Sequence, residues 1–279
     1  GNPVNPANAA KVLSGGSDLD FALPGAMPLV WQRQYSSYVN AEQGGYCGSL
    51  GYGWGVPFEL RLSVLASATL LHDSQGRTIT FDGLAPGESI YSASEDIWLL
   101  RTGMHPGGLA QELAAMTGGA RFTRAAESNA IPASASNPST ASVSASGAAL
   151  SPQQAPTWWK GRFAWMSRDM ACASHLILAA NGNGDTLWVF APSNWQAIEA
   201  ARKSLAAKEA KNPSAAPDTE LPVPSPNWIL LGKIDRLGRT QRYHWADILG
   251  QPRISGVEDG TGRHYQLHYT QALAAQDAQ

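Results

Sequence analysis

Several segments of the chain alternate apolar and polar residues, which is the pattern of a strand with one buried face. Residues 18–23 read Asp-Leu-Asp-Phe-Ala-Leu, residues 58–62 read Phe-Glu-Leu-Arg-Leu, and residues 239–245 alternate polar or basic with β-favouring residues. Residues 29–38 are rich in aromatic residues, and the Pro-Gly pair at 24–25 separates them from the first run. A turn between two such runs predicts a hairpin. The pattern therefore predicts a mainly β fold.

A twelve-residue repeat stands near the end of the sequence. Each of three aspartates is followed three residues later by a glycine, and two of these glycines precede an arginine. Aspartate favours the first position of a tight turn because its carboxylate accepts from nearby backbone amides, and glycine supplies the positive φ that closes it. One turn plus one strand per repeat predicts an antiparallel array of hairpins. The repeat residues are Asp235, Gly238, Arg239, Asp247, Gly250, Asp259, Gly262 and Arg263.

The same offsets occur earlier, at Asp73, Gly76 and Arg77, and more loosely at 181–189. The spacing lacks the dense acidic loop of a calcium site, so turn formation is sufficient to explain the aspartates. We expect the arginines to brace neighbouring strands through carbonyls or carboxylates rather than to bind a substrate.

The amino-terminal residues carry a family resemblance. The run LSGGSDLDFALPGAMPLVWQRQYSS, followed by GSLGYGWGVPFELRL, resembles the DUF6531-like domain that opens the shell of rearrangement-hotspot (Rhs) and YD-repeat polymorphic toxins. The resemblance covers about residues 3–81 and resumes over about 175–190 and 233–269. It implies a curved antiparallel sheet of strand-turn YD-type repeats, forming part of a β-cage.

The resemblance also implies a function. The chain would be a non-catalytic structural part of an Rhs-type shell that encapsulates a carboxy-terminal toxin and helps deliver it in interbacterial competition. Its partners would be the remainder of the shell, the toxin domain, type VI secretion spike components of the VgrG and PAAR kinds, and a chaperone. We expect it in the bacterial cytoplasm before export and secreted without a cleaved signal peptide. The family's autocleavage motif and toxin have no counterpart after Tyr269, so we expect a fragment of a larger shell.

Two insertions interrupt the scaffold. Residues 125–156 are almost entirely small or polar, too poor in large apolar groups to offset their ordering entropy, so we expect disorder. In the second insertion, Ser193 and Gln196 have capping-box spacing and Trp195 and Ile198 share one face, which predicts an amphipathic helix over about 194–211. The predicted segments are an Rhs-type β domain (1–124), the low-complexity insertion (125–156), continuing strands (157–194), helix plus proline-rich linker (195–227), and YD-repeat strands (228–279).

Composition narrows the range of partners. The 28 glycines and 18 prolines, with only 15% charged residues, indicate many turns. A formal net charge of -2 gives no electrostatic case for nucleic acid. No run of eighteen apolar residues is present, so we expect no membrane span. An unpaired sheet edge would make self-association unsurprising.

No catalytic or cofactor-binding pattern stands out. Cys172 and His175 lie three apart, but no glycine elbow or second base accompanies them, so we expect no enzyme activity and no cofactor or metal. One alternative function remains: a secreted or surface YD-repeat module that binds carbohydrate. Tyr52 and Trp54, in a glycine-dense stretch, are the candidate aromatic platform for a sugar ring.

Overall fold

The computed structural model describes residues 12–13, 19–37, 39, 47–74, 76–103, 122–124, 148–150, 175–182, 184–211, 220–248 and 250–270. Thirteen strands form one large sheet, in which the only parallel pair among the described strands is β11 with β13. These strands are β8 (Arg61–Val64), β9 (Ala68–His72), β10 (Thr78–Asp82), β11 (Ser89–Ser92), β12 (Ile97–Arg101), β13 (Phe122–Arg124), β14 (Ala148–Leu150), β15 (Ile177–Asn181), β16 (Thr186–Pro192), β17 (Asn227–Asp235), β18 (Thr240–Ile248), β19 (Gln251–Glu258) and β20 (His264–Gln266).

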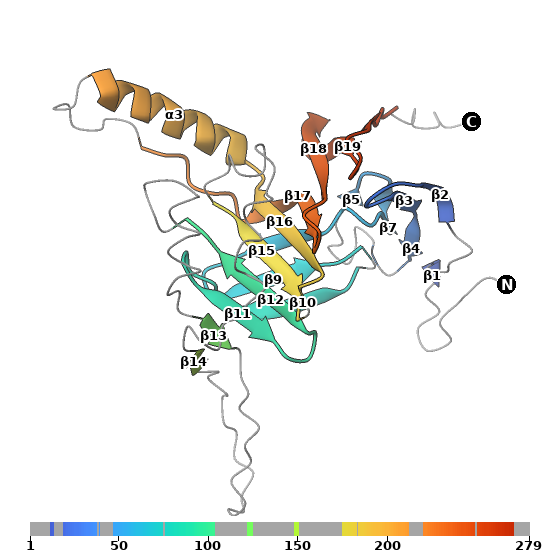
Figure 1. Cartoon of the computed structure of the whole chain (residues 1–279), viewed down its shortest axis with the longest axis horizontal. Coiled ribbons are helices and arrows are strands. Elements are labelled where there is room, and N and C mark those ends of the chain that lie inside the picture. The colour runs from blue at the N-terminus through green and yellow to red at the C-terminus, as the bar shows by residue number, and fades with distance from the viewer. Residues whose placement is uncertain are drawn as a thin grey trace, which may run out of the picture.

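The large sheet curls into a nearly closed barrel. Its main path runs β10-β9-β8-β17-β16-β15-β12-β11-β13-β14, and β11 also contacts β10, the strand before it in sequence, which brings the path back to its start. Strand β17 is the branch point. Its first residues pair with β8, as Trp228 with Leu62, and its last residues pair with β18, as Lys233 with Gln241. From there β18, β19 and β20 continue as a meander that rises from the barrel (Figure 1). The predicted mainly β, antiparallel fold is confirmed.

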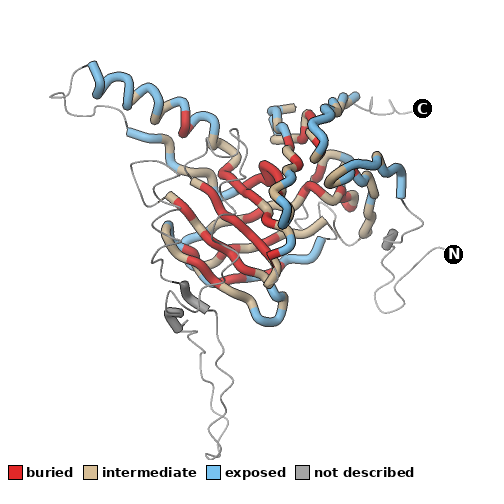
Figure 2. Tube along the Cα trace, in the orientation of Figure 1, coloured by how far each residue is buried: buried red, intermediate tan, exposed pale blue. Residues whose placement is uncertain are grey.

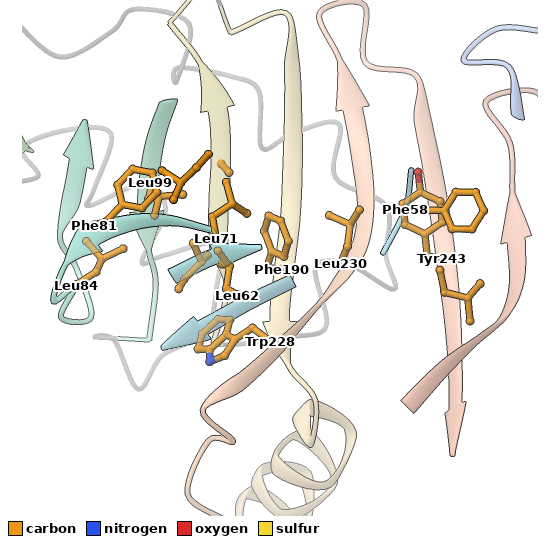
Figure 3. Packing of buried hydrophobic residues seen from close by; sticks show 14 of the residues in the cluster. Phe58, Leu62, Leu71, Phe81, Leu84, Leu99, Phe190, Trp228, Leu230 and Tyr243 are labelled. Carbon is orange, nitrogen blue, oxygen red and sulfur yellow. The ribbon is translucent and has the colours of Figure 1, made fainter. Parts of the chain in front are cut away.

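The central strands are buried on both faces. Alternate residues of β12, β15 and β16 enter two separate apolar clusters, with Leu99, Ile177 and Phe190 in one and Leu100 and Leu178 in the other. Figure 3 shows the first cluster, where side chains from opposite walls of the barrel meet. Figure 2 shows the same strands as a continuous buried block. Burial on both faces explains why these strands read as apolar runs rather than as strict alternation.

Short strands of the amino-terminal segment lie beside the meander (Figure 1). They form three small antiparallel sheets, of orders β1-β4-β7, β2-β3 and β5-β6. The predicted first hairpin is present as β2-β3, with Phe21 opposite Trp31. The bounds are β1 Val12–Leu13, β2 Leu19–Leu23, β3 Leu29–Gln32, β4 Gln34–Ser36, β5 Cys47–Gly48, β6 Gly51–Tyr52 and β7 Trp54–Gly55.

The predicted helix is confirmed as α3 (Trp195–Lys211), but its packing differs from the amphipathic expectation. Ile198 and Glu199 are its buried residues, Trp195 at its start packs against the core, and its later turns project away from the barrel (Figure 2). Asn194, rather than Ser193, is the capping residue, because its carbonyl accepts from the Ile198 amide at 3.2 Å. The Asn194 side chain accepts from the Ser225 amide at 2.8 Å and donates to the Val223 carbonyl at 2.9 Å. The amide therefore ties together the two ends of this insertion.

Strands from three of the segments predicted from the sequence join in one sheet. Strands from 61–101, 177–192 and 227–266 all belong to the barrel and its meander. Strand β14, at 148–150, falls within the insertion predicted to be disordered and pairs with β13. The remainder of that insertion, and residues 213–219 of the proline-rich linker, lie outside the described residues.

Candidate structural site: the aspartate-glycine-arginine turns

The turn between β17 and β18 is closed by Asp235 and Arg239. The Asp235 amide donates to the Arg239 carbonyl at 3.0 Å, and the Asp235 carboxylate accepts from the amides of Leu237 and Arg239, both at 2.9 Å. The guanidinium Nε of Arg239 donates to the same carboxylate at 2.6 Å. Gly238 has a φ of 80°, which a side chain rarely adopts. The aspartate, the glycine and the arginine of the repeat therefore each have a separate part in closing this turn.

Two further turns repeat this geometry. Asp73 accepts from the Arg77 amide at 2.8 Å and from its Nε at 3.2 Å, between β9 and β10. Asp259 accepts from the Arg263 amide at 3.1 Å and from its Nε at 2.7 Å, between β19 and β20. Gly76 and Gly262 have φ values of 82° and 84°. The structure therefore places these residues at turns, as the repeat predicts.

The looser copy of the repeat, at residues 181–189, keeps the backbone hydrogen bond of the turn but has no aspartate–arginine ion pair. Asn181 accepts from the Asp185 amide at 3.1 Å through its side-chain oxygen, and Gly184 has a φ of 65°. This turn joins β15 to β16. An amide oxygen is enough for the backbone contact, but a carboxylate also carries the charge that forms an ion pair with an arginine.

Asp247 was predicted to begin a repeat turn, and this prediction is wrong. It lies within β18, exposed and opposite Pro252, while Ile248 pairs with Gln251 across a tighter turn that contains Gly250. Gly250 keeps the expected positive φ of 73°. The residue four positions after Asp247 is Gln251, so this unit has no arginine to hold the carboxylate at the turn. Glycine thus determines the turn here without the aspartate.

Asp259 is the most strongly held of the aspartates. It is 2% exposed, and its carboxylate also accepts from the Thr261 hydroxyl at 2.6 Å and the Tyr265 hydroxyl at 3.2 Å. Burial opposes ionisation, but the hydrogen bonds from Thr261 and Arg263 outweigh it and hold the pKa of the Asp259 carboxyl well below its usual value. The pKa of Asp235 is lowered in the same way, with burial opposed by bonds from Arg239 and Leu237.

Two of the turn arginines also reach another part of the chain. The Arg263 guanidinium donates to the Pro24 carbonyl, in the turn of the β2-β3 hairpin. Arg77 pairs with Glu95 at 2.9 Å. Both contacts agree with the bracing role expected of these side chains.

Other residues of the meander hold the amino-terminal segment. The Gln241 amide nitrogen donates to the Met27 carbonyl at 3.3 Å, and Arg253 donates to the Gly48 carbonyl at 3.0 Å. The backbone at Gly260 approaches Ala26 so closely that a Cβ there would lie 2.0 Å from the Ala26 carbonyl oxygen. Sequence reasoning missed Gln241 and Arg253, because nothing in their local pattern indicates a partner two hundred residues away.

The ring contact of Phe58 with Tyr243 continues this junction into the core. Their centroids lie 5.6 Å apart, and both residues are buried. Nearby, the buried Glu59 carboxylate accepts from the Ser49 amide at 2.7 Å. Burial raises the pKa of Glu59, and the bonds from Ser49 counteract only part of that rise. An apolar contact and a set of backbone-directed polar contacts together join the two parts.

Tyr52 and Trp54, the candidate aromatic platform, do not form one exposed surface for a sugar. Tyr52 is 46% exposed, but Trp54 packs on Tyr35 with ring centroids 4.9 Å apart, and the Arg33 guanidinium lies 5.5 Å from the Trp54 ring. A sugar would need an open ring face, and both contacts compete for the faces of Trp54. This geometry favours a packing role for Trp54 over carbohydrate binding.

A pocket of about 380 Å³ lies where α3 begins beside β18. Its lining includes Trp195, Trp245, Arg242 and Asn194, and neither Tyr52 nor Trp54 contributes. The Trp245 indole nitrogen donates to the Leu230 carbonyl at 2.7 Å, which fixes one wall of the pocket.

Of Cys172 and His175, the structure describes only the histidine. Cys172 lies outside the described residues, and His175 packs beside Gly103. Within the part of the chain that the structure describes, no helix is both long and apolar enough to span a membrane.

Comparison with known proteins finds a family match for the amino-terminal residues. Residues 1–81 match the family described as "Domain of unknown function (DUF6531)". The chain is 33% identical over 102 residues to "Double-stranded DNA deaminase toxin A" of Burkholderia cenocepacia (strain H111), an alignment that covers 37% of this chain and 7% of that protein.

A second relative aligns with nearly all of the chain. "Toxin protein Tse5" of Pseudomonas aeruginosa (strain PAO1) is 26% identical over 273 residues, which cover 98% of this chain and 14% of that protein. The chain thus spans only a small part of the length of either relative. The resemblance is confirmed: residues 1–81 match the DUF6531 family, and the chain is similar to two toxins of the Rhs polymorphic type, which is consistent with an Rhs amino-terminal domain.

Proposed function

We propose that the chain is a non-catalytic structural part of an Rhs-type shell that encloses a carboxy-terminal toxin and helps to deliver it. One observation carries the proposal: side chains of the strand-turn repeats fasten the amino-terminal domain onto the meander. Arg263 binds the Pro24 carbonyl, Arg253 binds the Gly48 carbonyl, and Gln241 binds the Met27 carbonyl. Contacts with backbone atoms suit a joint between structural parts.

The edge of the meander supports the same proposal. Strand β20 pairs only with β19 among the described strands, so its other edge has backbone groups available for a further strand. A sheet that grows by hairpins of the same kind can add the next repeat at this edge. The amino-terminal domain would then close one end of a wall that further repeats extend.

The proposed partners follow from this role. They are the remainder of the shell, the toxin domain that it encloses, type VI spike components of the VgrG and PAAR kinds, and a chaperone. The protein would act after leaving the bacterial cytoplasm without a cleaved signal peptide. The two relatives are named as toxins, which supports a toxin-associated role.

Co-expression tests the shell function. The chain is produced together with shell sequence that continues the repeat array and with the toxin domain, and co-purification and protease resistance of the toxin domain are measured. We expect a stable complex in which the toxin domain resists protease. Omitting the chain should expose that domain to cleavage.

A matched pair of arginine variants locates the effect. Arg263→Gln removes the bond to Pro24, whereas Arg236→Gln changes an exposed arginine of another repeat turn. We expect only Arg263→Gln to weaken protection of the toxin domain, with circular dichroism verifying that both variants fold. Failure of the wild-type chain to associate with the remaining shell would contradict the proposed function.

A further inference from the structure

Three neighbouring strands bring two histidines and a glutamate together on the meander. Glu258 of β19 lies opposite Arg242 of β18 and opposite His264 of β20. His244 stands two residues after Arg242 and so shares its face of the sheet. The sequence separation conceals this cluster, because only the register of the three strands aligns the residues.

The distances suit a shared cation. The potential ligand atoms of His244, Glu258 and His264 all lie within 4.8 Å of one another. Glu258 Oε2 and His264 Nε2 are 3.5 Å apart. In a tetrahedral zinc site with bonds of about 2.0–2.1 Å, neighbouring ligand atoms are separated by roughly 3.4 Å. The Glu258–His264 pair already has that spacing, and a modest rotation of the exposed His244 side chain would complete the set.

The backbone at His244 is also irregular. The pairing of β18 with β19 shifts register between His244 and Trp245. A bulge of this kind redirects a side chain, and bulges are frequent beside functional sites. The centroids of the His244 and His264 rings lie 6.5 Å apart, with an interplanar angle of 30°. The two rings are therefore neighbours, and each can offer a nitrogen lone pair, which lies in the ring plane, to one ion.

We propose that His244, Glu258 and His264 bind a zinc-class divalent cation that clips β18 to β20 across β19. Two imidazoles and one carboxylate are a ligand set that zinc takes, with a water completing the fourth position. The ion would fasten β20, whose one partner among the described strands is β19. It would therefore stabilise the edge of the meander rather than supply chemistry.

Arg242 moderates the affinity of this site. Its guanidinium forms an ion pair with the same Glu258 oxygen that faces His264. A fixed positive charge beside a cation site opposes binding, whereas loss of that charge leaves the carboxylate fully available to the metal. Arg242→Gln should consequently tighten zinc binding, opposite in direction to the ligand variants.

Calorimetric titration tests the site. The full chain, free of any affinity tag and stripped of metal, is titrated with zinc chloride, and thermal unfolding is followed with and without the ion. We expect one ion per chain and a higher Tm with zinc, since a ligand that binds the folded state stabilises it. Magnesium chloride should give neither effect, because magnesium prefers oxygen ligands.

Histidine variants distinguish this site from adventitious surface binding. His264→Ala and His244→Ala should each weaken zinc binding by at least about tenfold. The matched control is His268→Ala, which alters an exposed histidine on the same terminal segment but outside the cluster. Circular dichroism in chelator verifies folding, and His244→Gln is the milder second variant. Unchanged affinity in both ligand variants, or an equal loss in His268→Ala, would overturn the proposal.

Discussion

Arg263 donates a hydrogen bond to the carbonyl oxygen of Pro24, 239 positions earlier in the chain. The same guanidinium is held by Asp259, only four residues away, with Nη2 and Oδ2 2.6 Å apart. A side chain that closes a local turn is thereby presented to the amino-terminal hairpin in a fixed orientation. One residue thus contributes both to a repeat turn and to docking of the amino-terminal hairpin.

The first prediction concerns that bond. Arg263→Gln should lower the free energy of unfolding by about 1–2 kcal/mol, because charged hydrogen bonds contribute more than neutral ones but this side chain is partly exposed. It should also increase amide hydrogen exchange in residues 19–32. Arg236→Gln is the control and should change neither quantity. Equal exchange in the two variants would show that the Pro24 contact does not hold the hairpin.

Acid should destabilise the fold through its turn aspartates. The folded-state pKa of Asp259 lies below its ordinary value of 3.8, so its contribution to stability is present above that pH and is lost as pH falls through the folded pKa. Asp235 behaves in the same sense. Unfolding in urea at a series of pH values should therefore show a steep loss of stability below about pH 4.

Asp259→Asn provides the corresponding control. The amide keeps an acceptor oxygen but loses the charge that binds Arg263, so the variant should be less stable near neutral pH. Its stability should then vary less with pH in the acid range, because the titrating group is gone. Parallel pH curves for the variant and the wild-type chain would assign the acid sensitivity to other residues.

Gly238 tests the backbone of the repeat turn. Its φ of 80° disfavours a side chain, so Gly238→Ala should cost about 1–2 kcal/mol of stability. Gly238→Asn should cost less, because asparagine tolerates the left-handed region better than alanine. Urea unfolding of the two variants measures the difference. Equal destabilisation would argue that lost contacts, rather than φ, account for the effect.

Trp228 tests the branch of the sheet. It is 1% exposed in β17, where the strand pairs with β8. Trp228→Ala should destabilise by about 3–5 kcal/mol through lost burial and the cavity left behind. Leu237→Ala, at a position 65% exposed in a turn, should be close to neutral. Chemical denaturation compares them, and a small effect at Trp228 would mean that the barrel core repacks readily.

The turns and the helix of this protein can be predicted from the sequence, because their hydrogen bonds join residues within about five positions of each other. The turns at Asp73, Asp235 and Asp259 and the helix to Lys211 were predictable for that reason, and the family of residues 1–81 followed from their characteristic run. Asp247 was mispredicted because an aspartate-glycine spacing does not reveal whether the strand continues past the aspartate.

Features that depend on strand register could not be read in this way. The Arg263–Pro24 and Arg253–Gly48 contacts join residues more than two hundred positions apart. The cluster of His244, Glu258 and His264 exists only because three strands align. A shift of one residue turns every side chain of a strand to the other face. Sheet curvature and pairing, which follow from burial of the whole core, therefore determined which distant side chains meet.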